Sequence, residues 1–407
     1  MRDIKHRGDF RIDSLATIIP EASQSEEVRI NILLPVFNTA QIYGGISTAL
    51  KVFSEMYKSD GFDARIIITG GARNNGGETY SELTYQFEEF NHNSERMGLV
   101  FLRENNRLDI RKNDYFIVTS WNTAYSFSDL FCWQCSHYSV KNRKFIYLIQ
   151  DYEPCFYPWS SEYALAESTY KTNSSQMIAL VNSRQLYDYL QNSGYTFSKI
   201  FFFEPSLNGK LKEILLKRNC SNGKRAKKII IYGRPNSNRN AFELLRYSLA
   251  CWAQQYEKAS EWEIVSLGDD FGDIEISSNN TIHSMGKLSL EGYADEMFSA
   301  YIGISLMVSP HPSYVPLELS TFGVKTITNT YANKDLSGFN PNIISIDSCS
   351  PQVLVQALTK LCNEYYSNDL GNVYCDTPYV TGNNFDEVVN TAKASLLEDL
   401  EHKFMNT

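Results

Sequence analysis

Long apolar runs are missing from this 407-residue sequence, and so is the apolar core of a secretory leader. The longest apolar runs, such as IGISLMV at 302–308, fall far short of the ~20 residues that a membrane-spanning helix needs. The opening residues, MRDIKHRGDFRIDS, do not form the hydrophobic segment of a signal peptide. We therefore expect a protein that does not cross a membrane and that works in the cytoplasm.

The familiar nucleotide and metal fingerprints are absent as well. No glycine-rich stretch completes the GxGxxG or the P-loop pattern, which argues against a dinucleotide oxidoreductase and a P-loop hydrolase. The six histidines include no HExxH, and GDDFGD at 268–273 lacks the length and the last glutamate of an EF-hand. Cys132 and Cys135 have no second pair nearby, so we read them as reduced structural residues. No metal or other cofactor is expected.

The composition is that of a folded protein, with 43% hydrophobic and 21% charged residues. A net charge of -9 argues against a general nucleic-acid partner, because such binding neutralises phosphates with Lys and Arg. At ~150 residues per domain, the length indicates two domains or more.

Short β-branched runs alternate with helix-period segments from residue 28 onward, which predicts two doubly wound parallel sheets. We expect an arm at 1–27, a first Rossmann-like domain at 28–207, a basic linker at 208–228, a second domain at 229–380 and a C-terminal helix within 381–407 that packs back on the first domain. Ligands of such domains bind at the carboxyl ends of the strands, so a cleft between the domains is the expected site. The predicted strands lie within 29–37, 65–69, 98–102, 114–121, 143–150, 177–183 and 199–205, and within 227–234, 262–270, 279–286, 302–310, 324–330 and 343–347.

One loop of the second half, in IIIYGRPNSNRNAFELL, places Arg234 and Arg239 between a strand and a helix start. A guanidinium offers a fixed fork of donors that matches phosphate oxygens, and a helix N-terminus attracts anions too. A diphosphate suits such a loop. Two ordinary surface arginines on a polar loop are the alternative.

Three more strand-to-helix loops are informative. Gly44 and Gly45 precede a helix and let the backbone approach a ligand closely. Pro316 fits a first helical turn, which leaves Glu318 near the helix start, either for sugar hydroxyls or only to favour the helix dipole. The fourth loop follows the strongest strand of the first half and is either a catalytic or acceptor-binding segment or an ordinary polar loop; its residues are Gln150, Asp151, Tyr152 and Glu153.

Taken together, these motifs resemble the retaining GT-B glycosyltransferases of family four over about residues 28–370. Gly44-Gly45 looks like the donor loop of that family, VNS at 181–183 and EPSLNG at 204–209 look like its end-of-domain segments, and YGRPNSNRN is similar to its phosphate loop. SPHPSYVPLELS is similar to its segment around two glutamates separated by seven residues, but Pro310 stands where the first glutamate is expected. Within the family, the chain is most similar to bacterial rhamnosyltransferases of surface-layer glycans and rhamnans.

The resemblance implies a nucleotide-sugar donor, dTDP-L-rhamnose, held by the second domain, and a glycan acceptor, lipid-carried, against the first. Arg234, Arg239 and Lys287 would stabilise the departing diphosphate, and Glu318 would bind the ribose. Asp151 and Gln150 would act near the reacting carbon, and Tyr152 and Glu153 would bind the acceptor. His311, Ser313 and Tyr314 would contact the sugar in place of the missing glutamate. Peripheral membrane association and a homodimer are left open.

A module that binds nucleotide sugars or carbohydrates without catalysis is the main alternative, and Pro310 is the best argument for it.

Overall fold

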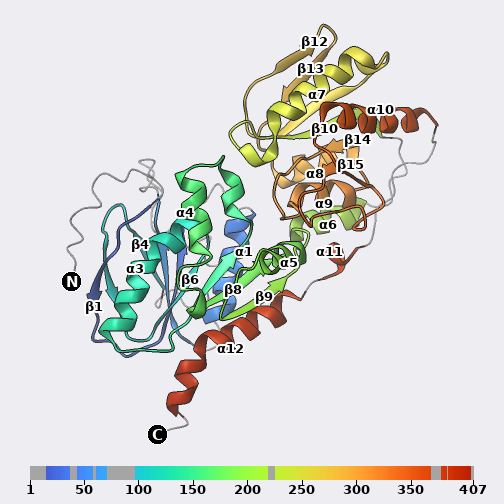
Figure 1. Cartoon of the computed structure of the whole chain (residues 1–407). Coiled ribbons are helices and arrows are strands. Elements are labelled where there is room, and N and C mark those ends of the chain that lie inside the picture. Colours follow the sequence, from blue (N-terminus) through green and yellow to red (C-terminus); the bar gives the residue numbers. More distant parts are fainter. Residues whose placement is uncertain are drawn as a thin grey trace.

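The computed structural model describes residues 15–36, 44–57, 61–70, 97–218, 225–367, 377–382 and 384–404. Within these residues the chain forms two α/β domains in succession, each built on a seven-stranded sheet (Figure 1). The prediction of two Rossmann-like domains is confirmed.

The first sheet is parallel throughout its described strands and runs in the order β4-β3-β2-β6-β7-β8-β9. Its central strands are buried along their whole length because helices cover both faces, which explains their continuous apolar runs. The strands are β2 (Arg29–Leu34), β3 (Asp63–Ile68), β4 (Met97–Phe101), β6 (Asp114–Val118), β7 (Phe145–Ile149), β8 (Met177–Asn182) and β9 (Lys199–Phe203).

Successive residues of β2 point to opposite faces of this sheet. Ile32 packs in the cluster that contains residues of α1 (Gly45–Tyr57), whereas Leu33 packs with α3 (Trp121–His137) and α5 (Arg184–Asn192). A further helix, α4 (Ser161–Thr169), lies beside α3.

The second sheet runs in the order β12-β13-β11-β10-β14-β15-β16, and β12 is its antiparallel strand. Helices α7 and α10 cover one face, and α6, α8 and α9 cover the other. The strands are β10 (Ala226–Gly233), β11 (Glu263–Gly268), β12 (Ile274–Ser277), β13 (Asn280–Ser284), β14 (Ala300–Ile304), β15 (Lys325–Asn329) and β16 (Ile343–Ile346), and the helices are α6 (Gly209–Arg218), α7 (Phe242–Gln255), α8 (Leu290–Ser299), α9 (Tyr314–Thr321) and α10 (Pro351–Ser367).

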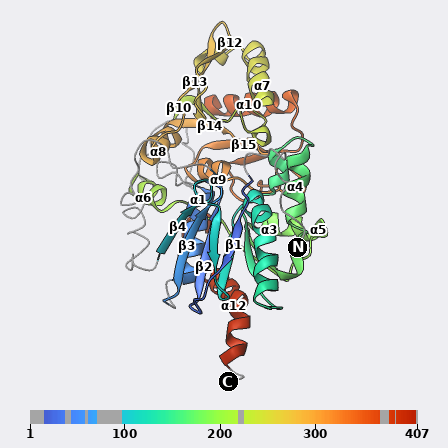
Figure 2. The same cartoon turned by 90° about the vertical axis from the view of Figure 1, so that its left-hand side faces the viewer.

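The strand order reverses once in each sheet, and the reversal decides where ligands can bind. The first sheet switches direction between β2 and β6, and the second between β10 and β14. Loops at such a point splay apart at the carboxyl edge, where α/β sheets bind their ligands. In Figure 2 the second domain sits over the end of the first sheet, with α1 and α9 at the junction.

Four segments differ from the sequence-based expectations, and one of them is β12 of the second sheet, which lies in none of the predicted strand ranges. Residues 209–218, assigned to the linker, form α6, whose Leu211 and Leu215 are buried against the second sheet. The arm at 1–27 contains β1 (Ile19–Ala22), which pairs in parallel with the equally unpredicted β5 (Arg107–Ile110). Both are four residues long, too short for a clear period-two pattern.

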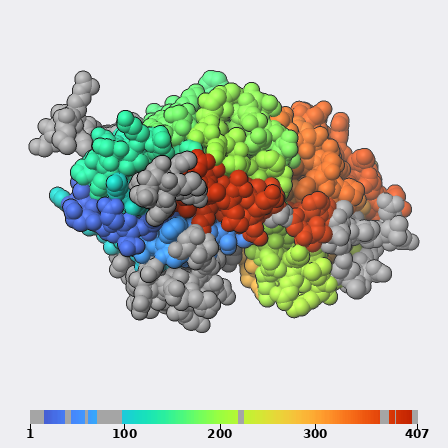
Figure 3. Space-filling model, turned by 90° about the horizontal axis from the view of Figure 1, so that it is seen from below, coloured from blue at the N-terminus to red at the C-terminus, as the bar shows by residue number. Residues whose placement is uncertain are grey.

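The chain crosses between the domains twice, and the two crossings lie side by side. The Asn384 Oδ1 atom accepts a hydrogen bond from the Glu204 N–H at 3.1 Å, and its Nδ2 donates to the Phe202 carbonyl at 3.1 Å. Beyond the second crossing, α12 (Phe385–Phe404) packs on the first domain. Figure 3 shows this red helix lying along the first-domain surface and leading toward the orange second domain.

The packing of α12 yields a test of the fold. Leu396 is 1% exposed in the first-domain core, so Leu396→Ala should lower the free energy of unfolding by roughly 2–5 kcal/mol. Asn390→Ala on the exposed side of the same helix is the matched control and should change it by less than about 0.5 kcal/mol. Urea unfolding measures both, and equal effects would contradict this packing.

Candidate active site

Asp151, the second residue after β7, connects the two domains through its side chain. Its carboxylate accepts hydrogen bonds from Arg239 Nη1 and Ser309 Oγ of the second domain, and from the Tyr152 N–H at 2.8 Å. Asp151 is only 6% exposed. A buried carboxylate with three donors, one of them a guanidinium, occupies the kind of donor arrangement that also holds a phosphate.

The loop after β10 supplies Arg239. This strand must end in glycine, because a Cβ on Gly233 would lie 2.1 Å from Ser266 Oγ. A 3-10 turn then carries Arg239, whose carbonyl accepts the Val308 N–H at 2.7 Å. The guanidinium lies over the Phe156 ring, 4.0 Å from its centroid, so a first-domain aromatic residue also fixes it.

Arg234 lies at the start of the same loop and has a different partner. Its Nε donates to Asp269 Oδ1 at 3.3 Å, and its side chain is 36% exposed. The structure thus places both predicted arginines on one loop but brings only Arg239 to the domain junction. The third predicted cation, Lys287, is exposed and follows Gly286, whose φ is +60°.

The loop after β14 supplies Ser309 and is fixed from three sides. Asn329 accepts the Met307 N–H at 2.7 Å, and the Lys334 Nζ donates to the Met307 carbonyl at 2.6 Å. Asn240, next to Arg239, donates to the Leu306 carbonyl at 3.2 Å. Burial lowers the pKa of Lys334 to about 8. The loops after β10 and β14, which both donate hydrogen bonds to Asp151, are therefore joined to each other by hydrogen bonds.

His311 has its ring fixed by this loop. Its Nδ1 accepts the Ser313 N–H at 3.0 Å, so the proton of the neutral ring belongs on Nε2. Burial lowers the pKa of His311 to about 4, which keeps the ring neutral near pH 7. Among the described residues the buried Nε2 has no hydrogen-bond partner. Ser313 takes a left-handed φ of +67° immediately before α9.

Two predicted sugar contacts lie on α9. The Tyr314 hydroxyl accepts a hydrogen bond from Asn182 at the end of β8, which is a second contact between the domains. Glu318 accepts a hydrogen bond from the Tyr293 hydroxyl at 2.9 Å, and burial raises the pKa of Glu318 to about 7. Pro316 lies in the first helical turn as expected, whereas Glu318 lies in the second turn.

Gly45, the first residue of α1, contacts the loop after β7. Gln150 Nε2 donates to the Gly45 carbonyl at 2.9 Å, and a Cβ on Gly45 would lie 3.3 Å from that nitrogen. Gly44 has a φ of +56°, which a residue with a side chain rarely adopts. Gln150 and the glycine pair are therefore adjacent, on the first-domain side.

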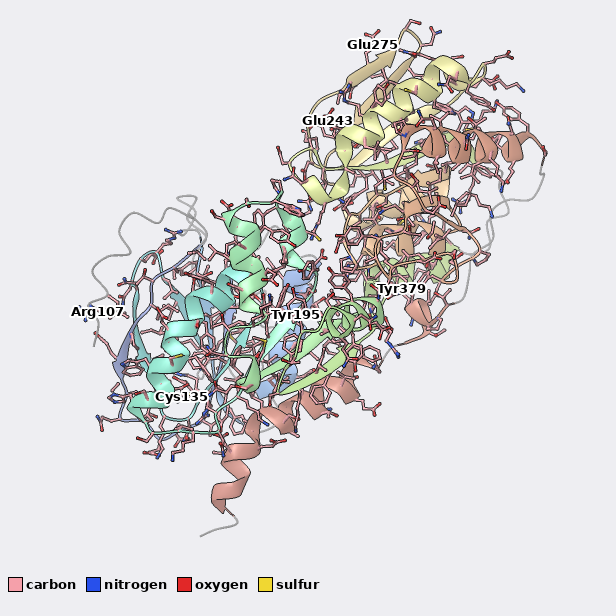
Figure 4. The ribbon with its side chains drawn as sticks, viewed as in Figure 1. Arg107, Cys135, Tyr195, Glu243, Glu275 and Tyr379 are labelled. Carbon is pink, nitrogen blue, oxygen red and sulfur yellow. The ribbon has the colours of Figure 1, made fainter. Side chains whose placement is uncertain are left out.

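Tyr152 and Glu153 do not point where the sequence analysis placed them. An extended chain would direct Asp151 and Glu153 to the same side, but a 3-10 turn starts at Glu153 and separates them. The Glu153 carboxylate accepts the Trp121 N–H inside the first domain, and the Tyr152 hydroxyl bonds to that of Tyr195 at 2.9 Å (Tyr195 is labelled in Figure 4). Glu153 is 8% exposed and Tyr152 is 5% exposed. Both residues are buried, so the expectation that they face the domain junction is wrong.

Sequence reasoning missed three residues of the site, namely Phe156, Ser309 and Lys334. Each matters through a contact with another segment of the chain, and Ser309 begins the SPHPSYVPLELS segment without a role that the local pattern could assign to it. The described residues contain no group of three or more His, Cys, Asp or Glu side chains that could hold a metal ion. No helix among the same residues has the length and the apolar composition of a membrane-spanning segment.

Glu153 generates a pH-dependent prediction. Burial raises the pKa of Glu153 to about 8, against 4.5 for an exposed glutamate. The carboxyl group of Glu153 therefore loses its proton at a higher pH in the folded state than in the unfolded state. Its contribution to stability therefore falls as the pH rises from about 4.5 to about 8. Glu153→Gln keeps an acceptor for Trp121 but cannot ionise.

The Glu153→Gln variant should lose less stability than the wild type between pH 5 and pH 9, by on the order of a few kcal/mol. Urea unfolding at several pH values measures the difference. Parallel pH profiles would show that Glu153 does not hold its proton.

Two family models match this chain. Residues 29–184 match the model described as WsaF, N-terminal domain, and residues 227–359 match WsaF, C-terminal domain. The O-antigen biosynthesis protein RfbC of Myxococcus xanthus is 29% identical over 217 residues, which are 53% of this chain. The match covers 15% of RfbC, so the chain spans only a small part of this relative.

Solved structures agree on the fold. HepE of Anabaena, in complex with UDP and glucose, superposes with a TM-score of 0.55 at 10% identity, over 92% of this chain and 99% of that one. The trehalose-phosphate synthase of Burkholderia vietnamiensis gives 0.52 at 9% identity, over 93% and 99%. These likenesses establish the GT-B architecture. With both matched domains in order over more than two thirds of its length, the chain belongs to the WsaF family.

Proposed function

We propose that this protein is a glycosyltransferase that moves a sugar from a nucleotide-diphosphate donor to a glycan acceptor. One observation carries the proposal: Arg239 and Ser309, from the two loops at the switch point of the second sheet, converge on the carboxylate of Asp151. Switch points are where α/β sheets bind nucleotides, and these donors suit a phosphate oxygen as well as a carboxylate.

In the proposed complex the donor diphosphate takes over Arg239 and Ser309 from Asp151. The bond between the anomeric carbon and the β-phosphate oxygen breaks, and the negative charge that develops there is stabilised by Arg239 and Arg234, with Lys287 nearby in the same domain. The acceptor hydroxyl forms the new glycosidic bond, and its proton passes to the departing phosphate. Attack from the same face as departure gives retention of configuration.

Asp151, once released, lies near the reacting carbon and stabilises positive charge there, while Gln150 holds the glycine pair at the mouth of α1. The His311 Nε2–H group donates a hydrogen bond to the transferred sugar. The glutamate that is expected at position 310, where this chain has Pro310, would instead accept one. Glu318 is assigned to the ribose.

The donor we propose is dTDP-L-rhamnose and the acceptor is a bacterial surface polysaccharide, lipid-carried at the inner face of the plasma membrane. Membership of the WsaF family and the O-antigen relative support this choice. HepE, whose structure holds UDP and glucose, shares the fold and supports a nucleotide-sugar donor. A homodimer and peripheral membrane binding belong to the same proposal.

The second candidate is a binding module without catalysis. Pro310 in place of a glutamate favours it, and so does the neutral, buried ring of His311. A binding module would bind dTDP, but it would not release dTDP from dTDP-L-rhamnose when a rhamnan oligosaccharide is present. Turnover of the donor therefore separates the two candidates.

The proposal predicts that Arg239→Ala lowers kcat/KM for the donor by roughly 10²–10³, because one donor to the developing charge is lost. The stabilisation of the protein by dTDP in a thermal-shift assay should also decrease. Arg239→Lys keeps the charge but not the fork of donors, so an intermediate loss is expected.

Arg246→Ala is the matched control, because it also removes one arginine of the second domain. Arg246 pairs with Glu243 on the exposed side of α7, where Figure 4 labels Glu243. Near wild-type kinetics are expected for this variant. Equal kinetics for Arg239→Ala and Arg246→Ala, with both variants folded by circular dichroism, would refute the assignment of the phosphate site.

A further inference from the structure

Trp159 is an exposed tryptophan that folding does not explain. Its side chain is 95% exposed, whereas Trp121, Trp252 and Trp262 are at most 3% exposed. A tryptophan stabilises a fold because its large ring is buried. A ring that stays in water contributes almost nothing to the stability of the folded state. The residue at this position therefore points to a ligand rather than to the core.

The surroundings of Trp159 form a small, asymmetric surface. Tyr163 stacks against the indole, with ring centroids 6.4 Å apart and an interplanar angle of 26°. Ser160 caps α4 by accepting the Tyr163 N–H at 3.3 Å, which fixes the aromatic pair to the helix start. Glu162 precedes Tyr163 in the first turn of α4, and hydrogen bonds from its own backbone and from Ser160 lower the pKa of its carboxyl group.

This surface belongs to the segment that leads away from Asp151. Phe156, which lies under the Arg239 guanidinium, is three residues before Trp159, so the two Cα atoms are at most about 11 Å apart. Trp121 Nε1 donates to the Tyr157 hydroxyl at 3.0 Å, and the two rings meet edge to face. The segment is therefore anchored up to Tyr157, two residues before Trp159.

We propose that Trp159, Tyr163 and Glu162 form a subsite for a sugar ring of the acceptor glycan, beyond the ring that reacts. A pyranose has an apolar face of C–H bonds, which matches an aromatic ring, and a rim of hydroxyls, which match a carboxylate. The indole is 95% exposed, so its face is open to such a ring. This inference rests on the proposed function, because it takes its ligand from the same reaction.

The charge of the segment favours a glycan over a membrane surface. Between Asp151 and Lys171 there are four acidic residues and one basic residue, Lys171 itself. Anionic lipid attracts clusters of Lys and Arg, and this segment has no such cluster, because its one basic residue, Lys171, pairs with Glu167. Neutral sugar hydroxyls, in contrast, are good partners for carboxylate oxygens.

The test compares Trp159→Ala and Trp159→Phe with the wild type, using dTDP-L-rhamnose and soluble rhamnan oligosaccharides of increasing length. We expect Trp159→Ala to raise the KM for the long acceptor about tenfold or more, with little change in kcat or in the KM for the donor. Trp159→Phe should recover part of the loss. A monosaccharide glycoside cannot reach the subsite, so its KM should not change.

Tyr247→Ala is the matched control, because it removes another exposed aromatic ring, 57% exposed on α7 of the second domain. Its acceptor KM should equal that of the wild type. Tryptophan fluorescence adds a readout that needs no turnover: the long oligosaccharide should change the emission of the wild type and not that of Trp159→Phe.

An unchanged KM for the long acceptor in Trp159→Ala would overturn the subsite while leaving the proposed function intact. Loss of binding to anionic lipid vesicles in that variant, with an unchanged KM, would overturn it in favour of a membrane contact. Absence of donor turnover in the wild type would instead count against the proposed function, and the fluorescence titration would then decide on the subsite alone.

Discussion

The Asp151 carboxylate makes a buried, charged contact between the two domains, and the proposed site depends on it. A buried carboxylate is costly unless it is paired, and its cationic partner, Arg239, comes from the opposite domain. The second loop that reaches it, through Ser309, is bonded to the first. An anion that replaced the Asp151 carboxylate would therefore accept hydrogen bonds from both loops at once. In the proposed function, this contact would link donor binding to the arrangement of the domains.

The scaffold behind this contact is built to keep its loops in place. Both loops of the second domain leave neighbouring strands, β10 and β14, and Asn240, Asn329 and Lys334 hold their backbones. On the first domain, the sheet positions Asp151, and Tyr170 donates to its carbonyl at 3.2 Å. The two crossings of the chain lie together at Asn384, so a change at the junction does not require either domain to unfold.

The alternation of apolar runs was sufficient to predict the two sheets, because buried parallel strands have a strong local signature. Loops that follow strands are recognisable too, so the sequence alone identifies Arg239 and Asp151 as candidate site residues. Ser309 and Phe156 could not be found in this way, since their roles come from contacts across the domain junction. The directions of Tyr152 and Glu153 were missed because a short turn interrupts the extended chain.

The most direct test of this account is a crystal structure of the protein with dTDP bound. The account predicts that the β-phosphate lies against the Arg239 guanidinium and Ser309 Oγ, with both bonds to the Asp151 carboxylate broken. A structure in which dTDP is bound elsewhere, while Arg239 and Ser309 still hold Asp151, would contradict it.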